Sequence, residues 1–178
     1  MFDKGTKDGS LRLMTPGELK IAREIFRDTI NYAKVWIHKG SYLPFGLQSM
    51  GTSMSPNGEM YFRDDYRSDF SKAHMRQQHT FIHELSHVWQ HQHGMNVKVR
   101  GLASWLVDYH YALSSWPLST YRMEQQAAII ADYYILAKFD DRADWASNGF
   151  CSNCKELSDE ELVLQYKYTL RSFPGNLR

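Results

Sequence analysis

The fold is decided by one stretch, Phe81-Ile82-His83-Glu84-Leu85-Ser86-His87-Val88-Trp89-Gln90-His91. Its apolar residues recur at helical spacing, which predicts one long helix over residues 70–93 that ends at Gly94. Residues four apart in a helix lie about 40° apart around the axis and about 6 Å apart along it. His83 and His87 can therefore bind one tetrahedral Zn²⁺ ion.

A candidate general base, Glu84, stands between these histidines. Its carboxylate can take a proton from a water that attacks a carbonyl carbon. A zinc ion lowers the pKa of such a water toward about 7 and polarises the carbonyl oxygen. The pattern predicts a metal-dependent hydrolase. The alternative is a helix whose histidines are solvated or satisfied in the core, and the apolar neighbours Phe81, Ile82 and Leu85 favour the metal site.

A catalytic zinc site needs a third protein ligand and an open position. The best candidate is Glu124, near the start of a helix predicted over residues 119–138. A carboxylate at the head of a face lined by Ala128 and Ala131 is costly to bury unless it meets a cation. The alternative is a solvated Glu favoured by the helix dipole. Asp132 can orient a zinc-binding histidine from behind, although a buried salt bridge would explain it equally well.

Three further histidines are weaker candidates. His79 and His91 each lie about 12 Å along the helix axis from the far zinc histidine, so we expect them at the surface or behind a ligand. His93 has the offset of the third histidine in metzincins, but Gln90 stands where that family has Gly. On an uninterrupted helix His93 points away from the site.

The other elements predict an α+β fold. Two segments, Thr15-Pro16-Gly17-Glu18 and Ser158-Asp159-Glu160-Glu161, have the capping-box pattern that begins a helix. Residues 32–38 and 58–63 are predicted strands, and the second follows the hairpin signal Asn57-Gly58.

The walls of the site are predicted from two segments. In zincins an edge strand binds extended substrate by backbone pairing, and residues 58–63 are the candidate for this strand. His110 and Tyr111 can donate hydrogen bonds to a developing oxyanion, although an aromatic core segment explains them as well. Cys151 and Cys154 are too few for a four-thiolate zinc site, and they either close a small loop or remain reduced.

Length and composition limit the class of protein. We expect a flexible leader at residues 1–14 and a single zincin-like domain at residues 15–178, mostly helical, with a small sheet beside the active-site helix. A net charge of +1 over 178 residues argues against binding nucleic acid. No stretch approaches the about 20 apolar residues of a membrane span. The N-terminus has no apolar signal segment, so we expect synthesis in the cytoplasm without a Sec signal.

Four blocks of sequence resemble one bacterial family. They are residues 13–18 with their continuation at 22–26, residues 55–62, residues 81–91 and residues 123–127. The sequence is similar over residues 11–140 to the "Vgr-related" zinc metallopeptidase-like proteins, which also occur as C-terminal toxin domains of type VI secretion spike proteins.

The resemblance implies a zincin with His83, His87 and Glu124 on zinc and Glu84 as the base. It also implies an antibacterial effector that a type VI system delivers to the periplasm of a competitor. The implied partners are a protein or peptide substrate, a spike or adaptor protein, and an immunity protein.

Two functions follow. The first is a zinc-dependent peptidase that hydrolyses a peptide or amide bond. The alternative is a non-catalytic module that keeps zinc for structure and serves as a docking or cargo protein of a secretion apparatus.

Overall fold

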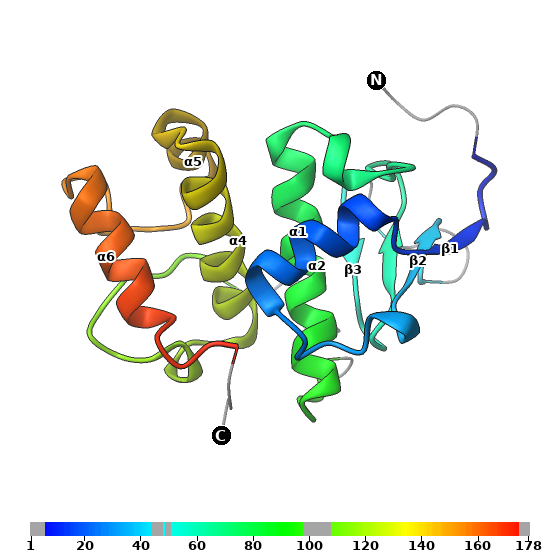
Figure 1. Ribbon diagram of the computed structural model, residues 1–178, viewed down its shortest axis with the longest axis horizontal. Helices are drawn as coiled ribbons and strands as arrows, with labels where there is room; N and C mark the ends of the chain where they lie inside the picture. The colour runs from blue at the N-terminus through cyan, green and yellow to red at the C-terminus, as the bar shows by residue number, and fades with distance from the viewer. Residues whose placement is uncertain (1–5, 44–47, 49–50, 98–107, 175–178) are drawn as a thin grey trace.

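The central element of the fold is helix α2 (Met75–Gln92), which lies between a small sheet and a group of helices (Figure 1). The structure is a computed structural model that describes residues 6–43, 48, 51–97 and 108–174. It has an α+β fold, as predicted, with four strands on one side of α2 and the helices α4 to α6 on the other. Residues 1–5 of the predicted leader lie outside the described residues.

The sheet has the strand order β1-β2-β4-β3. Its strands are β1 (Leu11–Leu13), β2 (Trp36–Lys39), β3 (Ser53–Met54) and β4 (Met60–Phe62). β2 and β4 are parallel, whereas β1 and β3 pair antiparallel to their neighbours. Ile37, Met60 and Phe62 are fully buried, so this face of the sheet forms part of the core.

Three features of the sheet differ from the sequence prediction. The predicted strand over residues 32–38 is shorter, because Tyr32–Lys34 forms a 3-10 helix and β2 begins at Trp36. The predicted edge strand, residues 58–63, is the inner strand β4, and the edge beside it is the two-residue strand β3. β3 is too short for an alternating pattern to reveal it. β1 lies within residues 1–14, the predicted leader, because Leu11–Leu13 pairs with β2. Gly58 has a φ of 84° in the turn between β3 and β4, which fits the predicted hairpin.

The helices begin close to the predicted caps. They are α1 (Pro16–Phe26), α2, α4 (Met123–Phe139), α5 (Arg142–Asn148) and α6 (Asp159–Thr169). Thr15 and Ser158 both form capping boxes. α2 starts later than predicted because His74 is its extended N-cap and residues 70–72 form a separate 3-10 turn. No helix in the described ranges is long and apolar enough to cross a membrane.

Helices α2 and α4 form the main helix pair of the core. Ala127, Ala128 and Ala131 of α4 are fully buried, as are Leu85 and Val88 of α2. Small side chains let two helix axes approach each other closely. This contact brings the start of α4 next to the middle of α2.

The buried carboxylate of Glu18 joins β1, α1 and the 3-10 turn. Arg12 donates two hydrogen bonds to it, of 2.7 and 2.8 Å. The backbone N–H groups of Thr15 and Phe70 donate to the same carboxylate, at 2.8 and 2.9 Å. Glu18 is 0% exposed, so these four hydrogen bonds satisfy a carboxylate that water does not reach.

We expect Glu18→Ala to lower the free energy of unfolding by about 3–5 kcal/mol, because it removes the carboxylate that the partly buried Arg12 guanidinium pairs with and the acceptor of two backbone N–H groups. The matched control is Glu24→Ala on the same helix, where the half-exposed pair with Lys138 should contribute less than about 1 kcal/mol. Urea denaturation of both variants measures the difference. Equal small losses would contradict the assigned role of Glu18.

Candidate metal centre

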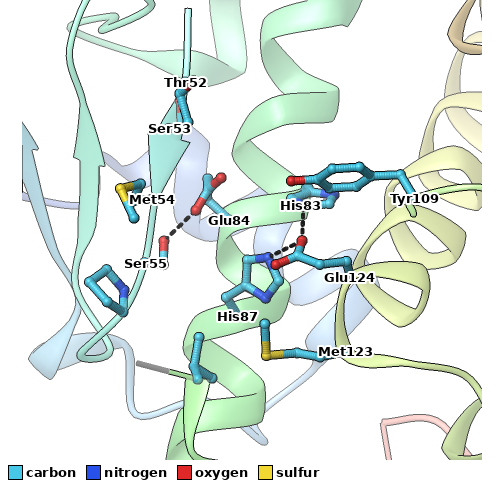
Figure 2. Close-up of a pocket in the computed structure, with 12 residues that line it drawn as sticks. Thr52, Ser53, Met54, Ser55, His83, Glu84, His87, Tyr109, Met123 and Glu124 are labelled. Atoms are coloured by element: carbon cyan, nitrogen blue, oxygen red, sulfur yellow. Dashed lines mark hydrogen bonds and ion pairs between the residues drawn. The ribbon is translucent and has the colours of Figure 1, made fainter. Parts of the chain in front are cut away.

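Helix α2 presents two histidines toward α4. The rings of His83 and His87 have centroids 4.9 Å apart and lie at 83° to each other. His87 is buried and His83 is partly buried. This is the one-turn spacing that the sequence predicts, and both Nε2 atoms point to the same side of the helix, toward Glu124 (Figure 2).

Glu124 comes to this pair from the first turn of α4. Its Oε2 atom lies 3.2 Å from His83 Nε2 and 3.0 Å from His87 Nε2. Ligand atoms of the three residues lie within 4.8 Å of one another. Two imidazole nitrogens and one carboxylate oxygen are a donor set of catalytic zinc sites, which keep a fourth position open. The three residues fit a metal ion.

The electrostatics of the cluster reflect buried opposite charges. Burial alone lowers the pKa of His87, but the charge of Glu124 offsets this effect and raises that pKa to about 9. Burial would raise the pKa of Glu124, and the charge of His87 instead holds it well below its usual range. A metal ion and protons therefore compete for the same atoms.

Gln90 fixes the orientation of His87 and was not identified from the sequence. Its Oε1 atom lies 2.8 Å from His87 Nδ1, while its Nε2 atom donates to Met123 O and Gln126 Oε1. The Gln90 carbonyl oxygen thus faces His87, so Nδ1 carries the proton and Nε2 is available as a ligand. Residues three apart in a helix lie on the same face, so the position of Gln90 three residues after His87 is the signal that could have identified it.

Glu84 lies beside the cluster and is also buried. Ser55 Oγ, next to β3, donates a 2.8 Å hydrogen bond to Glu84 Oε2. Burial raises the pKa of Glu84, while the charges of His87 and His83 act in the opposite direction. Ser55 and Glu84 lie 29 residues apart in the sequence, so no local pattern could have predicted this contact.

A pocket opens over these groups (Figure 2). It is lined by Thr52, Ser53, Met54, Ser55, Pro56, His83, Glu84, His87, Val97, Tyr109, Met123 and Glu124. Its walls therefore come from β3, from the two helices and from the segment that precedes α4. The candidate ligands and the candidate base face one common space.

The other predicted candidates lie elsewhere. His79 is buried and its Nε2 lies 2.8 Å from Asp132 Oδ1, so Asp132 contacts this histidine and not a candidate ligand. His91 packs against the turn at Gly58. His93 Nδ1 lies 2.8 Å from Trp89 O at the end of α2.

The two residues predicted to bind an oxyanion do not line the pocket. His110 is exposed and pairs with Asp108 at 2.6 Å. Tyr111 is buried and donates a 2.5 Å hydrogen bond to Asp132 Oδ2. Their neighbour Tyr109 enters the pocket instead, with its ring centroid 6.0 Å from that of His83.

The hydroxyl group of Tyr109 is available to a ligand. Within the part of the chain that the structure describes, no hydrogen-bond partner is recorded for it. Burial raises the pKa of Tyr109 to about 12, and the charges of Glu124 and Glu84 act in the same direction. Tyr109 is therefore a neutral hydrogen-bond donor that faces the candidate metal centre.

The fold is similar to that of an effector domain of a type VI secretion spike protein. The sequence is 37% identical over 133 residues to the type VI secretion system spike protein VgrG2b of Pseudomonas aeruginosa, and the match covers 70% of this chain and 13% of that protein. The effector domain of Pseudomonas aeruginosa VgrG2b superposes with a TM-score of 0.65 at 33% identity, covering 82% of this chain and 86% of the domain.

The chain belongs to the family of the VgrG2b effector domain, in agreement with the resemblance seen in the sequence. It spans only 13% of the length of the spike protein, so it matches one region of that larger protein. No family model matches the sequence.

We expect about one zinc per chain in the wild type and a loss of zinc affinity of at least about 100-fold in Glu124→Ala, because a missing ligand costs more than a missing outer partner. The matched control is His93→Ala, which should keep its zinc. Elemental analysis after dialysis, with a chelator competition titration, measures both. Full zinc retention in Glu124→Ala would move the third ligand to another residue.

Proposed function

We propose that this chain is a zinc-dependent peptidase with a zincin-like fold. In this proposal His83, His87 and Glu124 hold the zinc ion and Glu84 is the general base. The observation that carries it is the convergence of the three ligand atoms within 4.8 Å, with the buried Glu84 carboxylate facing the same pocket. A docking module has no need for a base in that position.

The zinc ion would supply Lewis-acid activation of the water and of the substrate carbonyl. Two observations support a metal ion here. The three residues supply the ligand atoms that zinc prefers, and the Glu124 carboxylate is buried, so it needs a positive charge beside it. Gln90 holds the His87 ring in the tautomer that can bind a metal.

Glu84 takes the proton of the attacking water and passes it to the leaving amine. Burial raises the pKa of Glu84, so its carboxylate accepts a proton more readily than the carboxylate of a solvated Glu does. The hydrogen bond from Ser55 holds Oε2, which leaves Oε1 for the water. Ser55 thus fixes the direction from which the base acts.

Tyr109 donates its hydroxyl proton in a hydrogen bond to the oxygen of the substrate carbonyl as negative charge develops there. A preorganised donor of this kind in a partly buried site stabilises the transition state more than the ground state. Tyr109 takes the role that the sequence assigned to His110 or Tyr111.

The substrate is an extended peptide segment that pairs with β3. β3 is the edge of the sheet beside the pocket, and among the described residues its pairing partner is β4. An extended peptide can add to such an edge through backbone hydrogen bonds. Ser53 Oγ is buried there without a hydrogen-bond partner in the described structure, so a bound segment could supply one.

The biological role follows from the family. The similar domain belongs to a type VI spike protein and is an effector domain. We propose that this chain is also an effector, loaded through a spike or adaptor protein and active in the periplasm of a target bacterium. The producing cell would then need an immunity protein that covers the pocket.

Glu84→Gln should keep its zinc and its fold but lose hydrolysis of a quenched-fluorescent peptide library by at least about 100-fold, because the amide cannot take a proton. Growth of bacteria that export the variant should recover in parallel. The control is Glu59→Gln, a partly exposed carboxylate that pairs with His38 and does not line the pocket. Unchanged toxicity in Glu84→Gln would favour the non-catalytic docking module.

Tyr109→Phe should lower kcat by about 10²–10³-fold with little change in zinc content, since it removes one oxyanion donor. Tyr121→Phe is the matched control, because Tyr121 precedes α4 and its hydroxyl bonds to Ala112 O outside the pocket. Steady-state kinetics on a cleaved library peptide measure both variants. A rise in KM alone would assign Tyr109 to substrate binding.

A further inference from the structure

The two cysteines of the chain form a disulfide between Cys151 and Cys154. Both residues are buried, and they lie in the loop that joins α5 to α6. The sequence left open whether they would pair. Neither the zinc site nor the proposed chemistry uses them.

The disulfide loop binds the backbone of residues 111–113. The N–H group of Tyr111 donates to Phe150 O at 2.9 Å, and the N–H group of Ser152 donates to Tyr111 O at 2.8 Å. Asn153 accepts from Leu113 N and donates to Leu113 O, both at 2.9 Å. The backbone N–H and C=O groups of both Tyr111 and Leu113 are therefore bonded to the disulfide loop.

The same loop supports Tyr109. The Phe150 ring lies 5.9 Å from the ring of Tyr109 and 6.3 Å from that of His79, measured between centroids. Tyr109 therefore stands between a ring from the disulfide loop and the candidate ligand His83, whose ring is 6.0 Å away. The loop sets the position of this wall of the pocket.

The far end of the loop is anchored to α5. Arg142 donates to Cys154 O at 3.2 Å and pairs with Asp159 at the start of α6. The disulfide links this anchored end to Cys151, and Cys151 forms a backbone β-bridge with Tyr111. Closing the disulfide thus connects the pocket wall to the two C-terminal helices.

We propose that the Cys151–Cys154 disulfide is a redox-dependent clamp that holds the 109–113 segment, and with it Tyr109, against the metal-binding pocket. The consequence for catalysis rests on the proposed function, whereas the clamp itself is a statement about structure. When both cysteines are reduced, the segment keeps its hydrogen bonds but opens more often.

The chemistry of the clamp is thiol–disulfide exchange. Two cysteine thiols give up two protons and two electrons to a disulfide oxidant such as oxidised glutathione, which leaves as two thiols. In a reducing cytoplasm the cysteines stay as thiols, and in an oxidising compartment such as the periplasm they pair. The pocket wall would then be fixed only after the chain has left the reducing compartment.

The test is hydrogen exchange of the wild-type chain, followed by NMR, in oxidised glutathione and in dithiothreitol. We expect the Tyr111 and Leu113 amides to exchange about tenfold faster or more after reduction, which is the effect of opening a short disulfide loop. The pair Cys151→Ser with Cys154→Ser should exchange like the reduced wild type. The Gly40 amide, bonded to Phe62 O in the sheet, is the distant control.

Asn153→Ala is the matched variant, because it removes the bonds to Leu113 and leaves both cysteines in place. Its Leu113 amide should exchange fast in both redox states. Equal rates for oxidised and reduced wild type would overturn the clamp, as would a parallel rise at Gly40 or free thiols after incubation with oxidised glutathione. Zinc content should be the same in both redox states. The exchange rates need no enzymatic activity, so they test the clamp even where the peptidase proposal fails.

Discussion

The contact between the Glu124 carboxylate and the two imidazoles of α2 is the interaction on which the site depends. A carboxylate that is 5% exposed needs a cation or several donors nearby, and His83 and His87 are the groups that face it. Protons on the imidazoles satisfy this need in one way and a divalent metal ion in another. The requirement to neutralise Glu124 therefore couples the packing of α4 on α2 to the metal-binding capacity of the cluster.

The sequence predicted the parts of this arrangement that depend on local rules. The spacing of His83 and His87 and the capping boxes at Thr15 and Ser158 follow from helix geometry and from side chains within one turn. Glu124 could be proposed because a carboxylate on an alanine-lined face has few stable environments. Each of these signals lies within a single element.

What the sequence could not predict depends on chain segments that meet only in the fold. Ser55 reaches Glu84 from a turn 29 residues earlier, and β3 becomes the sheet edge because β4 inserts between it and β2. Nothing in the sequence distinguishes Tyr109 from His110 and Tyr111, because the contact that orients this segment joins parts of the chain that are far apart in sequence. Tyr111 pairs with the loop at Cys151 and is buried against Asp132, and Tyr109 is the residue that enters the pocket.

Helices α2 and α4 carry two histidine–carboxylate contacts, and their difference explains why only one is a candidate metal centre. His79 meets Asp132, and His87 meets Glu124, so the helices run antiparallel with the two contacts about 12 Å apart. At the first level one imidazole faces the Asp132 carboxylate, and Tyr111 donates a hydrogen bond to the other oxygen of that carboxylate. At the second level two imidazoles face the Glu124 carboxylate, and the three groups line one pocket. The same residue types thus stabilise the helix pair at one level and can bind a metal ion at the other, and the deciding factor is the number of imidazoles that face the carboxylate.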